Sequence, residues 1–485
     1  MENKKIFNKW TILLMSLFII GITSIVLARK LPAYDYWWHL KSGEYIFTNK
    51  SIPFTDLFSW FGIQEGLYWH SHEWLSAVTI YLSSLVFGSM GGYVFCILTT
   101  FLLVLILFWT NKEGYFKNIK FSIIWIILGV LILMPVITAR PHMISFILLA
   151  LTMYLLSDIR KNENSKKIWF LPVVSILWVN FHGGSSNLPY VLAFMVLVTG
   201  LFDFKIGRLV GTKLSKKQQL KLLIVGVLSI IALVINPHGV DMITYPYANM
   251  NDSFMLSIIS EWRSPDLKQV SDIFIFVELF ILILPLLLGK EELDITDMGF
   301  IGSMVFLTFK SVRFSVLLYI ISSFVIFKYI PKLKDEKAVK QFSLVLGLAG
   351  VLFIGFFAME IPNISNEPMK VIVSDKIIET IKNENPKRLY NDYDFGGYLI
   401  YNEIPVFVDG RADMYSGHNL EDAVNLSRLD VGVEEILERY NFDMFVLYDS
   451  TPLNYYLKNS DDYFKLIEDD GIIVYKTIKE EIKGN

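Results

Sequence analysis

The stretch WTILLMSLFIIGITSIVLARKLPAYDYWWH, residues 10–39, places a long apolar segment directly before a cluster of acidic, aromatic and imidazole side chains. Residues 10–28 carry no charge and are long enough to cross a bilayer as a helix. Lysines precede them as in a signal peptide, but the residues that follow offer no convincing small-residue cleavage site. We therefore interpret 10–28 as a retained first membrane helix that is followed closely by Asp35.

The composition extends this pattern to the whole chain. Of 485 residues, 53% are hydrophobic and 19% charged, and the mean hydropathy is +0.46, which is typical of an integral membrane protein. The single cysteine, Cys96, lies in an apolar run, which excludes a disulfide framework or a cysteine metal site. No basic block with interleaved aromatics occurs in a soluble segment, so we expect no nucleic acid partner.

Hydropathy predicts a polytopic α-helical membrane protein with about eleven transmembrane helices. A further apolar stretch, 73–88, is short, polar at its start and dotted with serines, so we expect it to lie on the outer membrane surface. The predicted spans are 10–28, 90–110, 121–137, 143–157, 168–180, 188–202, 222–236, 273–289, 297–309, 314–330 and 341–358.

Basic residues set the orientation, because short cytoplasmic loops collect Lys and Arg. With 73–88 on the surface, four basic loops fall on the same side as the N-terminal lysines, and only the short loop at 290–297 departs from the rule. We therefore expect a multi-pass plasma-membrane protein with a cytoplasmic N-terminus. The four loops contain Lys112, Arg160, Lys205 and Lys332.

Charge divides the chain into two domains. Residues 359–485 hold 25 acidic and 13 basic residues, whereas residues 1–358 hold 22 and 31. We predict a transmembrane domain over 1–358, with its first outer loop at 29–89, and an extracytoplasmic α/β domain over 359–485.

The acidic domain shows short strand and helix patterns. Pro405–Val408 and Met444–Tyr448 are β-rich, and 371–383 and 420–440 have helical patterns. The segment FVDGRADMY, which follows the first of these strands, is interpreted as a charged turn in preference to a binding site.

The predicted topology brings the polar chemistry to one side of the membrane. All seven histidines fall on the outer side, although helix ends must carry polar residues in any case. A divalent metal is one option there, and its candidate ligands are Asp35, His39, His70, His72 and Glu73.

A first helix, an acidic residue that begins a long outer loop, and a surface helix before the second span together resemble the GT-C superfamily of membrane glycosyltransferases, which use polyprenyl-phosphate-linked sugars. The likeness covers about residues 1–358, and the string DYWWHLKSGEYI, with the later RPH, NFHGG, NPHG and EWRSP, also resembles a group of bacterial multi-span proteins. The resemblance implies that Asp35 is the catalytic base and Glu73 a second acid. Many members carry two adjacent acids at this point, whereas this chain has Asp35 followed by Tyr36. This departure from the family's pattern weakens the expectation of a metal-bound mechanism.

Transfer from a lipid phosphate needs cations that hold the leaving phosphate and polar groups that recognise sugar. For the phosphate we select Arg140, His142, Lys310 and Arg313, with the alternative that the last two reach lipid headgroups. For the substrate we select the two Asn-x-His-Gly strings, the SEWRSP loop and two first-loop histidines; the competing interpretation of the strings is helix termination. The substrate-binding candidates are His39, His72, Asn180, His182, Asn236, His238, Glu261, Trp262 and Arg263.

These features predict an inverting glycosyltransferase that moves a sugar from a polyprenyl-phosphate donor to a cell-envelope glycan, lipid or protein at the outer face. A transporter or flippase of lipid-linked glycans is an alternative, although no internal repeat is evident. A ligase that uses a polyprenyl-diphosphate carrier is another. The sequence leaves open the sugar, the acceptor, the metal dependence and the oligomeric state; the expected partners are the lipid donor and membrane lipids.

Overall fold

The computed structural model describes residues 9–31, 34–332, 336–365, 369 and 372–478, and their contacts divide the chain into two units. The helical unit comprises 1–31, 93–251 and 256–368. The mixed unit comprises 32–92, 252–255 and 369–485, so the first long loop groups with the C-terminal residues.

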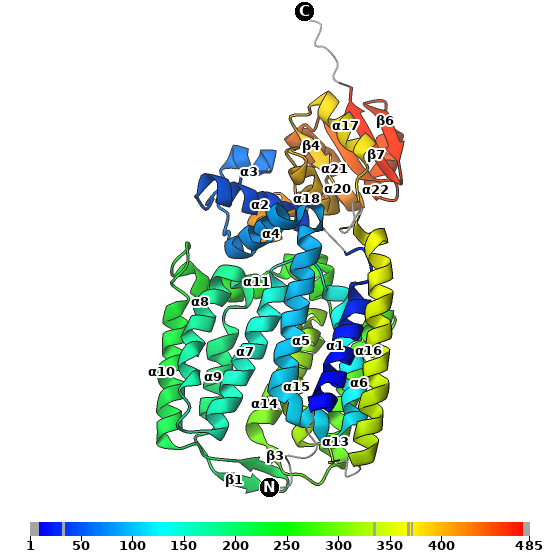
Figure 1. Ribbon diagram of the computed structural model, residues 1–485. Coiled ribbons are helices and arrows are strands. Elements are labelled where there is room, and N and C mark those ends of the chain that lie inside the picture. Colours follow the sequence, from blue (N-terminus) through cyan, green and yellow to red (C-terminus); the bar gives the residue numbers. More distant parts are fainter. Residues whose placement is uncertain (1–8, 32–33, 333–335, 366–368, 370–371, 479–485) are drawn as a thin grey trace, which may run out of the picture. The chain divides into compact units, whose positions relative to one another are not determined.

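Each of the eleven predicted spans is a helix in the helical unit. Shorter elements connect them: η3 (Met134–Val136), η4 (Lys167–Phe170), η5 (Gly183–Ser185), α11 (Asp241–Asn251), α12 (Ser253–Ile258), η6 (Ser260–Trp262), η7 (Val312–Phe314) and η8 (Ile326–Lys328). The long helices are α1 (Lys9–Leu27), α5 (Gly91–Lys117), α6 (Ile119–Leu133), α7 (His142–Lys161), α8 (Leu171–Phe181), α9 (Leu188–Thr199), α10 (Lys216–Ala232), α13 (Val270–Leu288), α14 (Ile295–Lys310), α15 (Ser315–Val325) and α16 (Glu336–Ser365) (Figure 1).

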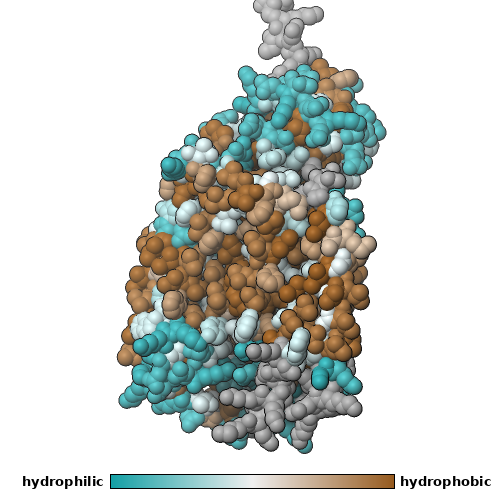
Figure 2. Space-filling view, in the orientation of Figure 1, coloured by the Kyte–Doolittle hydropathy of each residue, from teal (hydrophilic) through white to brown (hydrophobic). Residues whose placement is uncertain are grey.

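The helical unit has the surface of a membrane protein. Among the described residues, six helical segments are long and apolar enough to cross a bilayer, and two shorter apolar segments cover 167–181 and 183–199. Figure 2 shows a hydrophobic band over the helices of this unit, to which α10 contributes exposed side chains such as Leu223, Val227 and Ile231. A soluble protein would not expose so large an apolar surface. The chain is therefore a polytopic membrane protein; the count of eleven spans stays a prediction.

Close packing of α1 on α16 depends on two glycines. A Cβ atom on Gly21 would overlap the backbone of Gly350, and a Cβ on Gly350 would overlap the backbone of α1 at Leu17. Small residues of this kind let membrane helices approach closely, where dispersion contacts replace the hydrophobic effect as the driving force.

A small sheet closes one end of the helical unit. β1 (Phe204–Ile206) pairs antiparallel with β2 (Leu209–Gly211), which pairs in parallel with β3 (Leu293–Asp294). Asp297, on the first turn of α14, is fully buried and contacts Arg160 at 2.6 Å and Lys328 at 2.6 Å. These two cations compensate the charge of the buried carboxylate.

The mixed unit joins three helices of the first loop to a four-stranded α/β fold. The sheet order is β4-β5-β7-β6, in which β4 and β5 are parallel and the other pairs antiparallel. The elements are α2 (Tyr36–Asn49), α3 (Trp60–Glu65), α4 (Trp74–Phe87), η2 (Gly88–Met90), α17 (Asp375–Glu384), β4 (Leu389–Asn391), η9 (Tyr393–Phe395), α18 (Gly396–Tyr401), α19 (Ala412–Tyr415), α20 (Leu420–Arg428), α21 (Val433–Tyr440), β5 (Met444–Tyr448), α22 (Pro452–Lys458), β6 (Tyr463–Asp469) and β7 (Ile472–Thr477).

Several predictions for the C-terminal residues are corrected. Pro405–Val408 is not a strand; Val406 makes only an isolated bridge with Ser59. The predicted helix at 420–440 is two helices, because Leu429 and Gly432 adopt positive φ angles of 59° and 86°, which a continuous helix excludes. The helix predicted at 371–383 begins only at Asp375 in the structure, so residues 372–374 lie before it. The strand at Met444–Tyr448 is confirmed.

A buried ion pair links the first loop to the C-terminal fold inside the mixed unit. The Arg411 side chain, 1% exposed, donates two hydrogen bonds to Asp409, at 2.8 and 2.6 Å, and one to Asp56 at 2.7 Å. Its guanidinium carbon also lies 4.7 Å from the ring centroid of Trp69. Burial alone would lower the pKa of Arg411, but the two carboxylates raise it well above its usual value. Arg411 therefore remains charged in the interior.

Arg411→Leu should cost about 3–5 kcal/mol of stability, because it leaves Asp56 and Asp409 buried without their cation. Denaturant unfolding of the full chain in detergent, followed by tryptophan fluorescence, measures the loss. Arg439→Leu is the matched control, since the Arg439–Asp422 pair has an arginine side chain that is 58% exposed and such pairs contribute little. Equal losses in the two variants would contradict the role assigned to Arg411.

Candidate functional site

Asp35 occupies the N-cap position of α2 in the mixed unit. Its side chain is half-buried, and a Cβ atom on Gly410 would collide with its Oδ1 atom and approach the indole Nε1 of Trp38. The glycine thus allows the carboxylate and the indole to face the same point beside the 408–411 turn. Asp35 is a residue with a constrained position and not an exposed loop acid.

Glu73 links two of the predicted histidines in the mixed unit. Its Oε2 lies 3.4 Å from His39 Nε2, and its Oε1 lies 3.3 Å from His72 Nε2. His72 Nδ1 lies 2.9 Å from the carbonyl oxygen of His70, to which it can only donate. When Nε2 also donates a hydrogen bond to the Glu73 carboxylate, both ring nitrogens carry a proton and His72 is an imidazolium. Burial is the largest single effect and lowers the pKa of His72, but the charge of Glu73, the hydrogen bonds to Glu73 and His70 and the charge of Asp413 together outweigh it, so the net shift is upward from 6.5.

A metal site is not defined by these side chains. Within the described ranges, no group of three or more His, Cys, Asp or Glu residues has the arrangement that would hold a metal ion. Of the five candidate ligands, the structure brings together His39, His72 and Glu73, whereas His70 contributes a backbone carbonyl and its ring meets that of Tyr68 edge to face, with ring centroids 4.7 Å apart.

Three of the four candidates for phosphate binding, Arg140, His142 and Arg313, lie near Glu261 at one end of the helical unit. Arg140, at the start of α7, contacts Glu261 of η6, with Nη1 and Oε1 2.5 Å apart. The guanidinium of Arg313 in η7 lies over the indole of Trp262, 5.4 Å from its centroid. α13 and α14 run from η6 to β3 and back to η7, so this cluster lies at the other end of these helices from the small sheet. We call Arg140, Glu261, Trp262 and Arg313 the arginine cluster.

The backbone fixes this cluster. The Ser311 hydroxyl donates to the carbonyl oxygen of Glu261 at 2.9 Å, and the Val312 amide donates to that of Arg263 at 2.9 Å. The Arg140 and Arg313 charges lower the pKa of Glu261 to about 2, against the opposing effect of burial. The carboxylate is therefore ionised at all physiological pH values.

Three neighbouring candidates make further contacts in the helical unit. His142 Nε2 donates to the Val136 carbonyl oxygen at 2.8 Å and orients its ring beside the two arginines. Arg263 turns to Asp272, with which it makes hydrogen bonds of 2.5 and 3.0 Å. Lys310 is exposed, and its Nζ lies 5.8 Å from the ring of Phe306 on its own helix.

The two Asn-x-His-Gly strings meet in the helical unit. Asn180 Nδ2 donates to the carbonyl oxygen of Ile235 at 2.8 Å, which joins the end of α8 to the end of α10. Asn236 caps its own turn, with Oδ1 accepting from the His238 amide at 2.6 Å and Nδ2 donating to Gly239 at 3.0 Å. The asparagines thus make the contacts expected for helix termination, and their role in substrate binding stays a prediction.

His182 belongs to a buried hydrogen-bond network. Its Nδ1 lies 2.7 Å from the Ser145 hydroxyl and 3.1 Å from that of Ser185, and the Trp178 indole donates to both hydroxyls. No pattern in the sequence marked Ser145, which comes from α7. Asp56 was also missed as the partner of Arg411, although the D-x-x-S spacing of Asp56 and Ser59 is typical of a carboxylate that caps a turn.

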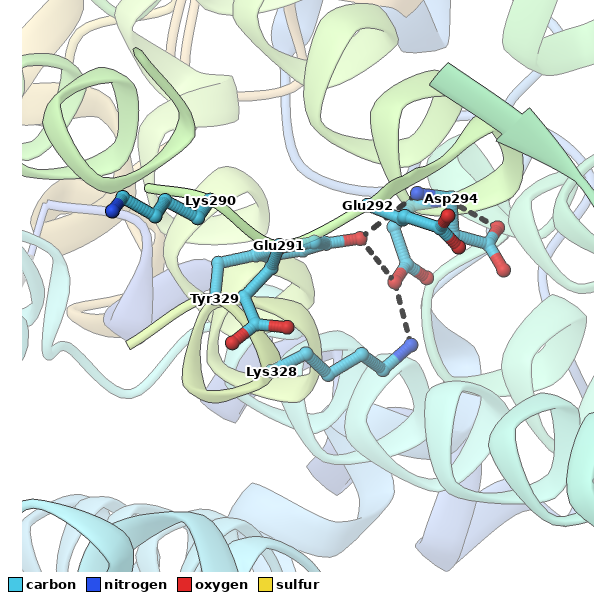
Figure 3. Close-up of a pocket in the computed structure, with 7 residues that line it drawn as sticks. Lys290, Glu291, Glu292, Asp294, Lys328 and Tyr329 are labelled. Atoms are coloured by element: carbon cyan, nitrogen blue, oxygen red, sulfur yellow. Dashed lines mark hydrogen bonds and ion pairs between the residues drawn. The ribbon is translucent and has the colours of Figure 1, made fainter. Parts of the chain in front are cut away.

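A polar pocket of about 430 Å³ lies at the opposite end of the helical unit, next to β3. Figure 3 shows the side chain of Lys328 directed into the hydrogen-bonded group and that of Lys290 directed away from it. The remaining lining residues are Glu291, Glu292, Asp294, Asp297 and Tyr329. None of them was a predicted site residue.

The fold is shared with solved membrane proteins. No family model and no curated protein matches the chain. An oligosaccharyltransferase from Archaeoglobus fulgidus is similar in its apo form, with a TM-score of 0.54 at 11% identity over 99% of this chain and 75% of that one. With a tethered acceptor peptide, the same enzyme gives 0.52 at 11% identity over 98% and 74%.

ArnT from Cupriavidus metallidurans, bound to undecaprenyl phosphate, is also similar, with a TM-score of 0.50 at 10% identity over 97% of this chain and 98% of that one. At such identities the likeness establishes the fold alone. The chain therefore shares its fold with the oligosaccharyltransferase and with ArnT.

The stability contributed by His72 should depend on pH. Because its folded-state pKa is raised, the charged ring adds stability that is fully present below about 6.5 and is lost as the pH rises through the folded-state pKa. Glu73→Gln removes the partner, so the difference in Tm between wild type and variant should shrink from pH 6 to pH 8.5. Thermal unfolding of both proteins in detergent across this range measures it, and parallel curves would contradict the pairing.

Proposed function

We propose that the protein transfers a sugar from a polyprenyl-phosphate-linked donor to a cell-envelope acceptor at the outer face of the plasma membrane. The proposed topology has a cytoplasmic N-terminus, eleven spans and extracytoplasmic C-terminal residues from 359 onward. The observation that carries the proposal is the fold, which is shared with an oligosaccharyltransferase and with a protein that binds undecaprenyl phosphate.

The arginine cluster supports the assignment of a lipid-phosphate ligand. Arg140 and Arg313 face one carboxylate, and arginine presents paired N–H donors that match phosphate oxygens. These groups come from a loop and from the beginning of a helix, which lie in different parts of the chain. Hydrogen bonds to backbone carbonyl oxygens hold the loop in place. We assign the donor phosphate to Arg140 and Arg313, with His142 beside them.

The reaction follows from the groups so assigned. An acceptor hydroxyl oxygen forms a bond to the anomeric carbon, the bond from that carbon to the phosphate oxygen breaks, and the electron pair stays on the phosphate. Attack from the face opposite the leaving phosphate inverts the configuration. The hydroxyl proton passes to the carboxylate of Asp35, the proposed general base, and the arginines stabilise the charge that develops on the phosphate.

Asp35→Asn should lower the turnover of a polyprenyl-phosphate-sugar donor by about 10²–10⁴-fold, because the amide cannot accept the proton. Purified full-length protein in lipid, assayed for transfer of radiolabelled sugar from a panel of donors, provides the measurement. Asp461→Asn, which changes an exposed acid of the same unit, should be silent.

The same assay separates the rival functions. Equal turnover in wild type and Asp35→Asn would remove the base assignment while keeping the transferase. Turnover only from diphosphate-linked glycans would identify a ligase. If no donor reacts and labelled lipid crosses the bilayer equally in both proteins, the protein is a flippase and the proposal fails.

Arg313→Gln should weaken binding of the lipid phosphate about tenfold or more, since it removes a charged donor from the arginine cluster. Lys310→Gln, three residues away, should change it little because its ammonium lies over Phe306. Affinity for polyprenyl phosphate, measured in detergent by microscale thermophoresis, tests both. A larger effect of Lys310→Gln would reverse the assignment.

A further inference from the structure

Glu261 is the one feature of the arginine cluster that the binding of an anion does not explain. A carboxylate in a phosphate site repels the ligand, yet Glu261 makes the shortest contact of the group, 2.5 Å from Arg140. Its side chain is only partly buried, with 42% of it exposed, so water can still reach the carboxylate and the pair is not needed to keep a fully buried charge in the protein. An acid in this position needs a reason that concerns the ligand.

The carboxylate cannot simply swing away with its loop when a ligand arrives. The peptide group of Glu261 is held by Ser311, that of Arg263 by Val312, and Trp262 lies under Arg313. These contacts hold the segment on both sides of Glu261 against the turn that carries Arg313. The negative charge therefore remains part of the site, and it withholds one unit of positive charge from any anion that binds there.

The two lipids that such a site meets differ by one charge. A sugar-bearing polyprenyl phosphate is a phosphodiester with one negative charge, whereas the released polyprenyl phosphate is a monoester that carries close to two above its second pKa of about 6. A second negative charge near Glu261 is repelled at short range, where Coulomb interactions in a site of reduced dielectric are substantial.

We propose that Glu261 makes the phosphate site selective for the singly charged phosphodiester donor over the doubly charged monoester product. This inference rests on the proposed function, and it names both the class of donor and the way in which the product is released. It also disfavours a diphosphate carrier, which brings at least one charge more than the phosphodiester.

The test is a binding measurement that needs no turnover. Affinities of the full-length protein in detergent are measured for a short-chain polyprenyl phosphate and for its methyl phosphodiester, at pH 8.0. For Glu261→Gln, the affinity for the monoester should rise about tenfold relative to the diester, the equivalent of about 1.4 kcal/mol. Glu261→Asp, which keeps the charge, should keep the wild-type ratio.

Two controls separate a local effect from a general one. Glu292→Gln removes one acid at the other end of the helical unit, where Glu292 pairs with Lys205, and should leave the ratio unchanged. At pH 5.0, where the monoester carries about one charge, the difference between wild type and Glu261→Gln should disappear. Size-exclusion profiles and Tm values show that each variant is folded.

Each outcome decides the matter. An equal gain for both lipids in Glu261→Gln, or no gain, overturns the selectivity, and so does the same ratio change in Glu292→Gln. Diester selectivity that is lost in Glu261→Gln supports the inference even if no donor is turned over, in which case the proposed transfer fails separately. Tighter binding of a polyprenyl diphosphate than of the diester by wild type would overturn the assigned donor class.

Discussion

A buried guanidinium between two buried carboxylates is the interaction on which the mixed unit depends. Removing Arg411, Asp409 and Asp56 from water is expensive, and their close mutual contacts compensate much of that cost, together with hydrogen bonds with Tyr415 and with backbone amides near Asp56. Asp56 lies more than 350 positions before Asp409 and Arg411 in the chain. The ion pair therefore fixes the first loop against the C-terminal fold. It thereby positions Gly410, next to Arg411, against the carboxylate of Asp35. The position of Asp35, the proposed base, thus depends on Arg411, which takes no part in the proposed reaction.

The helical unit shows the same constraint in an apolar setting. A bilayer offers no water to polar groups, so each buried charge has to find its partner within the protein. Asp297 meets this requirement with Arg160 and Lys328 at the end near β3. Arg140 and Glu261 make a comparable contact at the far end of α13 and α14, but there the carboxylate is 42% exposed and a second arginine lies nearby. In the first arrangement the carboxylate is fully buried between two cations, while in the second the carboxylate is partly exposed and arginine is in excess over acid.

The fold was largely predictable from the sequence because the signals that define it are local. An apolar run of sufficient length specifies a helix whatever it packs against, which is why each of the eleven predicted segments is helical. The failures occur where structure depends on a single backbone angle or on a distant partner. Gly432 divides one predicted helix in two, and Val406 meets Ser59 where a strand was expected. Asp56 carries no mark of its pairing with Arg411, since nothing in either segment specifies the other.

The candidate site divides along the same line. Residues chosen for charge at a helix end converged when loop and turn were held together by the backbone, as Arg140, Glu261 and Arg313 are. Of the residues chosen for a repeated string, the two asparagines, Asn180 and Asn236, direct their amides to carbonyl oxygens at helix ends. A side-chain amide whose two N–H groups both donate to backbone carbonyl oxygens has no donor left for a ligand. A guanidinium has five N–H groups, so it can bind a carboxylate and still donate to a phosphate. The chemistry of the ligand therefore has to be sought where donors outnumber the acceptors that the fold supplies, and in the helical unit the arginine cluster meets that condition.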